Sequence, residues 1–144
     1  MGDDNQNIQD RTLDFAVRVV KLCQFLDEQG GVARVLYKQL IRSGTSIGAN
    51  VREAQSAQSD KDFLHKLEIA LKEARETEYW LTVLIKAQII EEQKIKHLLE
   101  ESNRILKILI TITRKLKIKL KKLKHPQNPY PKKTTNHEPL PTNH

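Results

Sequence analysis

The first 125 residues of this chain contain no proline, and all five prolines lie within the last twenty positions. Proline breaks the interior of a helix, so its absence over such a length permits long uninterrupted helices. Only 5% of the residues are aromatic, and Leu, Ile, Lys, Glu and Ala, which lose little side-chain freedom in a helix, are abundant. A chain of 144 residues is long enough for one domain with a core of its own. The sequence therefore predicts a single all-α domain without sheet.

Apolar side chains recur at steps of three and four in four segments separated by short breaks. The first segment stops at Gly30-Gly31, a natural helix terminator, and the third opens at Ser59 or Asp60, a good N-cap. The predicted helices span residues 10–28, 32–55, 60–88 and 91–122. Short connections make consecutive helices antiparallel neighbours, so the predicted fold is an up-down-up-down four-helix bundle over residues 1–124.

Each predicted helix carries an apolar stripe suited to a core. In the third helix the stripe runs over three heptads, through Phe63, Leu67, Ala70, Ala74, Thr77, Leu81 and Leu84. The first helix offers two adjoining stripes, one through Leu13, Ala16, Val20 and Cys23 and one through Phe15, Val19, Leu22 and Leu26. The fourth has a main stripe from Ile95 to Leu123 and a second through Leu99, Leu106, Ile110 and Leu120. A helix at the corner of a bundle needs only one apolar arc, and extra apolar residues on its flanks must contact another subunit or stay exposed. The extra apolar width of the fourth helix therefore predicts a homo-oligomer.

Two glycines interrupt the second predicted helix, and each should cost about 1 kcal/mol relative to alanine. Gly44 and Gly48 share one face with Ile47 and Val51, which favours close approach of another helix at that face. The alternative is a kink near Ser43 without a packing role.

No pattern in the sequence is typical of a catalytic, metal or cofactor site. The histidines, at positions with no zinc-site spacing, are interpreted as surface residues: His65, His97, His125, His137 and His144. Cys23 lies on an apolar stripe without a nearby base, and the chain has no Gly-rich phosphate loop after a strand. The prediction is a protein that is not an enzyme and has no metal and no cofactor.

Glu78 falls next to the core stripe of the third helix, beside Tyr79 and Trp80. A buried carboxylate needs a partner, and the second helix offers Arg42, Asn50 or Arg52. We interpret this as a structural polar contact.

The single cysteine excludes a disulfide framework and suits a reducing compartment. Residues 1–11 are acidic and amide-rich and lack the basic flank and apolar run of a signal peptide. No stretch approaches eighteen apolar residues. The predicted location is the cytoplasm, without a membrane span.

Lysine and arginine are concentrated towards one end of the chain. Residues 1–103 carry 14 Lys+Arg against 17 Asp+Glu, whereas residues 104–144 carry 11 against 1. Nine of the cations lie within twenty positions: Arg114, Lys115, Lys117, Lys119, Lys121, Lys122, Lys124, Lys132 and Lys133. Favourable placement at a helix C-terminus explains two or three of them, not nine. The last part, residues 125–144, is rich in Pro, Asn, Thr and Lys and is predicted to be a flexible tail.

A family resemblance rests on residues 39–54, which contain Arg42-Ser43, Ser46-Ile47 and Ala49-Asn50, followed by residues 62–63, 67–74 and 76–81. Over about residues 15–90 the chain resembles the bacterial four-helix-bundle proteins encoded in intervening sequences of large-subunit ribosomal RNA genes. The resemblance implies a ring-like homopentamer and kinship with the accessory variability protein of diversity-generating retroelements, which works with a reverse transcriptase and binds nucleic acid. The lysine-rich end lies outside the resembling part.

These observations predict a non-catalytic, homo-oligomeric protein that binds the phosphate backbone of RNA or DNA. The predicted contact residues are Arg114, Lys115, Lys117, Lys119, Lys121, Lys122 and Lys124, with Arg42 and Arg52 as weaker candidates. An anionic membrane surface would satisfy the same charges, since the apolar flank of the fourth helix could lie in a bilayer interface. Wide apolar faces in a chain that already has three partner helices favour nucleic acid over the membrane. The alternative function is a protein-interaction scaffold whose basic end docks an acidic partner protein.

Overall fold

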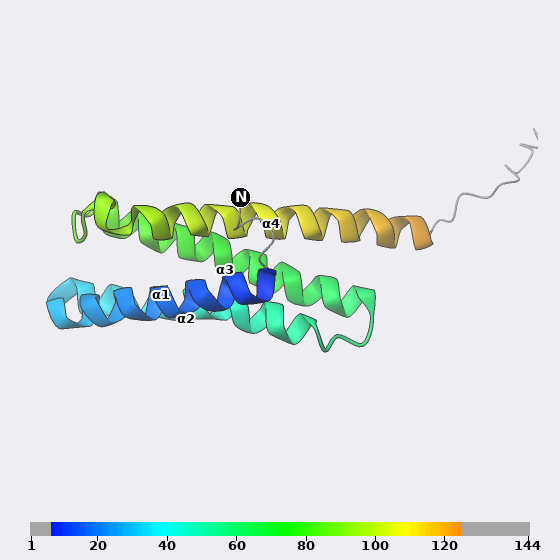
Figure 1. Ribbon diagram of the computed structural model, residues 1–144, viewed down its shortest axis with the longest axis horizontal. Coiled ribbons are helices and arrows are strands. Elements are labelled where there is room, and N and C mark those ends of the chain that lie inside the picture. Colours follow the sequence, from blue (N-terminus) through cyan, green and yellow to red (C-terminus); the bar gives the residue numbers. More distant parts are fainter. Residues whose placement is uncertain (1–6, 125–144) are drawn as a thin grey trace, which may run out of the picture.

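The computed structural model describes residues 7–124, and its secondary structure is entirely helical over that range. The helices are α1 (Ile8–Gln29), α2 (Gly31–Ala54), α3 (Asp60–Lys86) and α4 (Glu92–Lys124), and they lie side by side in a long bundle (Figure 1). The predicted all-α, four-helix fold class is confirmed, and each helix begins and ends within two residues of its predicted bounds. The predicted tail, residues 125–144, lies outside the described residues.

Local sequence signals set the helix ends. The Asn7 side chain caps α1 by accepting a hydrogen bond from the Gln9 amide at 2.8 Å, and Ser59 caps α3 by accepting from the Asp62 amide at 3.0 Å. Between α1 and α2, Gly30 and Gly31 have φ angles of 70° and 57°, in the left-handed region that side-chain-bearing residues rarely adopt. The chain therefore reverses at the predicted glycine pair and at the predicted serine cap.

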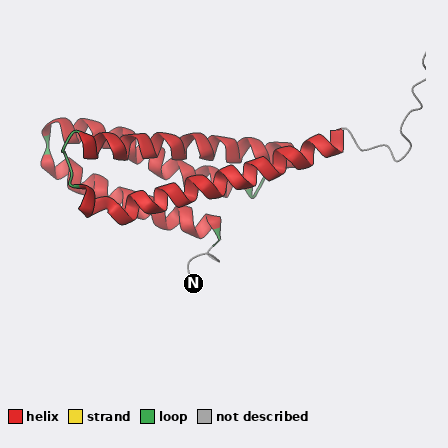
Figure 2. Ribbon diagram, turned by 90° about the horizontal axis from the view of Figure 1, so that it is seen from above, coloured by secondary structure: helices red, strands yellow, loops and turns green. Residues whose placement is uncertain are grey.

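Each helix packs against two others. Contacts join α1 to α2, α2 to α3 and α3 to α4, and a smaller contact joins α1 to α4. The core between them is formed by aliphatic side chains with a single phenylalanine, and its largest fully buried members include Phe15, Leu26, Leu40, Ile47, Leu67, Leu81, Leu84, Ile105 and Leu109. At its C-terminal end, α4 continues beyond the other three helices (Figures 1 and 2).

The two glycines of α2 mark the close approach of α1. α2 runs through both positions as one α-helix. A Cβ atom on Gly44 would lie 2.7 Å from Val19 Cγ1, and one on Gly48 would lie 3.2 Å from the backbone oxygen of Thr12. The predicted close approach is confirmed, and the neighbouring helix is α1 of the same chain.

A buried ion pair joins the start of α1 to the first third of α4. Arg11 is only 5% exposed, and its Nε lies 2.6 Å from Glu101 Oε1, although the two groups are not aligned as a hydrogen bond. Arg104 approaches the second oxygen of the same carboxylate at 3.7 Å. This pair reinforces the smallest of the helix–helix contacts.

Two parts of the predicted core stripes are wrong. Leu13, on one of the two stripes considered for the first helix, is 47% exposed, because α1 turns its Phe15 stripe towards the other helices. Leu123, at the end of the predicted α4 stripe, is 65% exposed because it lies past Asp60, where α3 begins. The second stripe on α4 is half-buried. Of the eight exposed large apolar side chains among the described residues, five lie on α1 and the start of α2, and the others are Tyr79 on α3 and Ile118 and Leu123 on α4. The group on α1 and α2 consists of Leu13, Val17, Phe25, Val32 and Val35.

Candidate nucleic-acid interface

The C-terminal part of α4 presents seven cations to solvent, which we call the basic end: Arg114, Lys115, Lys117, Lys119, Lys121, Lys122 and Lys124. The helical repeat places Thr113, Leu116 and Leu120 on the opposite side, where they are buried or half-buried. From Arg114 to Lys124 the helix rises by about 15 Å. Seven positive charges therefore lie within a span of about 15 Å, close to the linear charge density of a nucleic-acid duplex, one charge per about 1.7 Å.

Only two of these cations are neutralised by carboxylates of the described residues. Lys117 Nζ lies 3.1 Å from Glu68 Oε1, and Lys119 Nζ lies 3.3 Å from Asp60 Oδ2. Within residues 7–124, the other five cations of the basic end have no carboxylate partner. The structure therefore divides the predicted set into two paired lysines on the α3 side and five cations with uncompensated charge.

Helix α3 adds two cations that sequence reasoning missed. Lys61, in the first turn of α3, joins Lys117, Lys121 and Lys124 around a groove of about 410 Å³ whose apolar floor is formed by Leu64 and Leu120.

Arg75 lies farther along α3 and lines a second groove, of about 370 Å³, together with Arg114, Lys117 and Lys121. The predicted antiparallel order could have indicated Lys61, because it brings the start of the third helix to the end of the fourth. Arg75, in the middle of α3, had no such signal.

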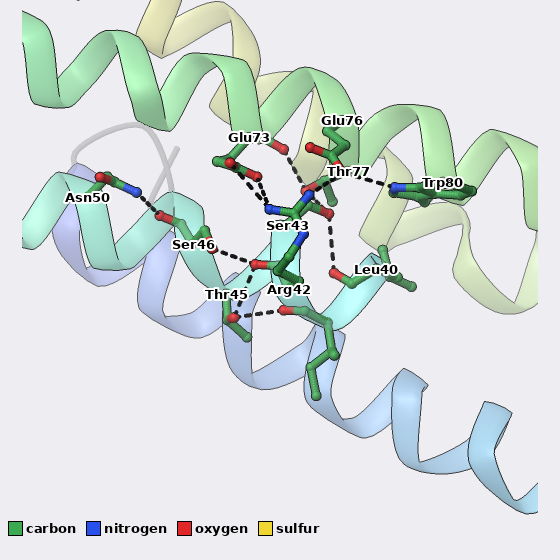
Figure 3. Close-up of polar contacts among 11 residues, drawn as sticks. Leu40, Arg42, Ser43, Thr45, Ser46, Asn50, Glu73, Glu76, Thr77 and Trp80 are labelled. Carbon is green, nitrogen blue, oxygen red and sulfur yellow. Dashed lines mark hydrogen bonds and ion pairs between the residues drawn. The ribbon is translucent and has the colours of Figure 1, made fainter. Parts of the chain in front are cut away.

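Arg42 has a structural role (Figure 3). Its Nη1 lies 3.2 Å from Glu73 Oε2, and its Nη2 donates to Glu76. Glu76 also accepts a hydrogen bond from Trp80 Nε1 at 3.3 Å. The hydrogen bond from Arg42 lowers the pKa of Glu76 below its usual value, against the opposing effect of burial. Two carboxylates thus compensate the Arg42 charge, and we do not include this residue in the candidate interface.

Arg52 lies on a different surface. It is exposed, and it lines a groove of about 700 Å³ formed by α1, α2 and the start of α3, with Leu13 and Gly48 among its neighbours. No carboxylate of the described residues pairs with it, and the groove contains no residue of α4. Arg52 and the basic end are therefore separate features.

The polar residues around Arg42 are satisfied within the bundle. Thr77 Oγ1 donates either to Ser43 Oγ, at 3.0 Å, or to the Glu73 carbonyl oxygen, at 2.8 Å, and both hydroxyl-bearing residues are fully buried. Ser46 donates to the Arg42 carbonyl oxygen, and Asn50 Nδ2 donates to the Ser46 carbonyl oxygen at 2.8 Å. Of these hydrogen bonds, the one between Thr77 and Ser43 joins α3 to α2, whereas Ser46 and Asn50 bond within α2.

The predicted partner of Glu78 is wrong. Arg42 binds Glu73 and Glu76 instead, and Asn50 bonds to its own helix. Glu78 is half-buried, and its backbone oxygen accepts a hydrogen bond from Thr82. Glu73 and Glu76 face α2, on the side of α3 that also carries the buried Thr77.

The described residues hold no group of three or more histidine, cysteine or acidic side chains placed to bind a metal ion. Cys23 is buried, its thiol points towards the Tyr37 carbonyl oxygen at 3.7 Å, and burial raises its pKa to about 11. None of the helices between residues 7 and 124 is long and apolar enough to cross a membrane.

Fold and surface together define an all-helical bundle protein with a cationic helix end. The family model of the 23S rRNA-intervening sequence protein matches residues 4–111, and the chain belongs to this family. The resemblance predicted from residues 39–81 is thus confirmed, and the match extends beyond the predicted residues 15–90 on both sides. The basic end, which begins at Arg114, lies outside the match, as predicted.

A solved structure supports the same assignment. The chain is 49% identical to a crystallised protein of unknown function from the S23 ribosomal protein family of Bacteroides thetaiotaomicron, with a TM-score of 0.69. The alignment covers 74% of this chain and 98% of that protein. None of the curated proteins matches the chain.

Proposed function

We propose that this chain is a non-catalytic nucleic-acid-binding protein whose basic end holds the phosphate backbone of RNA or DNA. The observation that carries the proposal is the set of five exposed cations without a carboxylate partner among residues 7–124: Arg114, Lys115, Lys121, Lys122 and Lys124. Charge of one sign at this density attracts phosphates, because each neutralised phosphate releases condensed counterions.

The chemistry of the basic end favours backbone contact over base recognition. Residues 104–124 contain no aromatic side chain on which a base could stack, and no Asn or Gln that could pair with a base edge. Lysine is a point charge that binds a phosphate without discriminating between sequences. Binding should therefore depend strongly on salt and weakly on sequence.

The proposal includes an assembly of antiparallel, up-down-up-down bundles into a ring-like homo-oligomer. Support comes from the exposed apolar side chains of α1 and early α2, such as Leu13, Val17 and Val35, which a neighbouring subunit would cover. In such a ring several basic ends would act on one polyanion, which raises the apparent affinity without any new contact. The homopentamer and the reverse-transcriptase partner that the resemblance implies stay predictions, as does the cytoplasmic location.

The test measures binding against salt. Because the family name refers to 23S rRNA, the first probe is a short RNA duplex of mixed sequence, with a DNA duplex of the same sequence beside it. Five phosphate contacts per subunit predict a slope of about −4.5 in a plot of log affinity against log salt, which is a loss of about 500-fold between 50 and 200 mM.

Lys121, Lys122 and Lys124, changed together to Gln, should reduce the slope by about 2.7 and weaken binding at least about tenfold. The matched control changes Lys38, Lys72 and Lys86 to Gln, which removes the same charge from exposed positions elsewhere on the bundle. Equal effects of the two triple variants, or an affinity that does not depend on salt, would refute the proposal.

A second candidate function is the docking of an acidic partner protein. The groove between Lys61, Lys117, Lys121 and Lys124 favours it, because its floor of Leu64 and Leu120 could take the apolar face of an acidic helix. A pull-down from cell extract, repeated with nuclease treatment and with RNA as competitor, separates the two functions. A partner that survives nuclease and resists RNA would favour docking.

A further inference from the structure

A second basic surface lies between α1 and α4, at the other end of the bundle. It is a groove of about 420 Å³, within the size range of small-ligand sites. Its floor is formed by the buried residues Leu22, Ile90, Ile95 and Leu98, and its rim carries Arg18, Lys21, Phe25, Lys94 and His97. No carboxylate lines this groove.

Three cations on the rim have uncompensated charge. Within residues 7–124, no carboxylate pairs with Arg18, Lys21 or Lys94, whereas His97 lies 3.6 Å from Glu100. Arg18 and Lys21 come from α1, and Lys94 comes from the first turn of α4. Positive charge from two helices therefore meets over an apolar floor.

Phe25 distinguishes this groove from the basic end. Phe25 is 39% exposed above the buried floor, and the Lys94 ammonium lies 6.0 Å from the centroid of its ring. An exposed aromatic ring beside cations is the combination that binds single-stranded nucleic acid, since the ring stacks on a base while the cations hold the flanking phosphates. The basic end has cations without a ring, and this groove has both.

We propose that the α1–α4 groove binds single-stranded nucleic acid, with a base against Phe25 and phosphates at Arg18, Lys21 and Lys94. The inference rests on the proposed function, because it assigns single-stranded nucleic acid to a second surface of the same nucleic-acid-binding protein. From Lys94 to Arg114 the helix rises by about 30 Å, so that the two surfaces can be changed independently. The basic end serves duplex backbones, and the groove serves unpaired segments.

The test compares a ten-residue oligouridine with an RNA duplex as probes for the full chain. Phe25→Leu, which keeps an apolar side chain but removes the ring, should weaken oligouridine binding about fivefold or more and change duplex binding less than about twofold. Tyr79→Leu is the matched control, because Tyr79 is an aromatic residue that is 60% exposed on α3. It should leave both probes unaffected.

A second variant tests the cations without touching the floor. Lys21→Gln with Lys94→Gln should reduce the salt slope for oligouridine by about 1.4, at about 0.7 per contact, whereas Lys38→Gln with Lys72→Gln should not change it. Circular dichroism before and after heating shows whether each variant is folded.

The possible failures are distinguishable. If Phe25→Leu and the Lys21/Lys94 variant bind oligouridine as the wild type does, while the basic-end variant loses the duplex, the inference is overturned and the proposed function stands. If neither probe binds the wild type, both are overturned. If Phe25→Leu changes the mass of the particle in solution and leaves binding intact, the groove is a contact between copies of the chain and the inference is overturned.

Discussion

Replacement of Gly44 by alanine tests the close approach of α1 and α2. The added Cβ would lie 2.7 Å from Val19 Cγ1, 3.0 Å from Val19 Cγ2 and 3.3 Å from Val19 Cβ. Rotation of the valine side chain offers no relief, because it exchanges one methyl group for the other, and valine in a helix keeps one strongly preferred rotamer. Carbon atoms pack at about 3.5–4.0 Å, so the two helices must move apart by several tenths of an ångström or more.

Two opposing terms set the magnitude. Overpacking of a buried contact typically costs about 1–3 kcal/mol, and Val19 is fully buried. Alanine in place of glycine stabilises a helix interior by about 1 kcal/mol. The net result for Gly44→Ala is a loss of about 1 kcal/mol in the free energy of unfolding, which lowers Tm by about 4 °C in a domain of this size.

The assay is urea unfolding followed by circular dichroism at 222 nm. Ala49→Gly, at an exposed position of α2, is the control that measures the helix-propensity term by itself. The double variant Gly44→Ala with Val19→Ala removes the obstructing methyl groups and should be more stable than the sum of the single effects predicts. A gain in stability for Gly44→Ala equal to the loss for Ala49→Gly would refute the argument, because it would leave the propensity term alone.

Three further predictions concern charged and titrating groups. Glu101→Gln should lower the free energy of unfolding by about 3 kcal/mol in urea titrations, because it leaves Arg11, 5% exposed, without a counter-charge. Burial raises the pKa of Cys23 from 9.0 to about 11, so the native state favours the neutral thiol. The neutral thiol therefore contributes fully to the free energy of unfolding below pH 9, and this contribution is lost as the pH rises towards 11. Cys23→Ala should remove this alkaline loss. The hydrogen bond from Arg42 lowers the pKa of Glu76 from 4.5, so the ionised carboxylate stabilises the fold above pH 4.5 and this stabilisation is lost as the pH falls. In Glu76→Gln the free energy of unfolding should therefore decrease less between pH 4.5 and lower pH than it does in the wild type.

Each of these outcomes has a clear opposite. An unchanged stability of Glu101→Gln would show that the buried pair contributes nothing. Rapid reaction of native Cys23 with a disulfide reagent at pH 8, at the rate of a free thiol, would contradict the raised pKa. An acid limb that is the same in wild type and Glu76→Gln would assign the acid dependence to other carboxylates.

The α3 stripe shows what repeating local geometry makes predictable. Six of its seven predicted members are buried, Leu67, Ala70, Ala74, Thr77, Leu81 and Leu84, and Phe63 at its start is half-buried. Steps of three and four place these side chains on one side of a helix whatever it packs against. On α1, in contrast, two adjoining stripes fit the same repeat. The packing of α1 against α2 and α4 buries Phe15 and leaves Leu13 exposed, although Cys23, on the same stripe as Leu13, is buried as well.

The role of Arg42 shows what no local pattern contains. Its partners, Glu73 and Glu76, are 31 and 34 residues away along the chain and face it only because α2 packs on α3. The packing of α4 on α3 likewise gives Lys117 and Lys119 their carboxylates, and it places Lys61 beside Lys117. Sequence reasoning therefore located the cations but could not separate compensated charges from free ones.

By itself, the sequence determined the elements: proline-free segments with apolar steps of three and four, glycine and serine at the helix ends, and cations crowded at one terminus. These are properties of neighbouring residues, and backbone geometry turns them into helices with defined faces. Tertiary structure alone decided which α1 face is buried, which lysines are neutralised, and that Phe25 shares a groove with cations from two helices. Each of these depends on the distance between side chains far apart in the chain, which only the packing of whole helices sets.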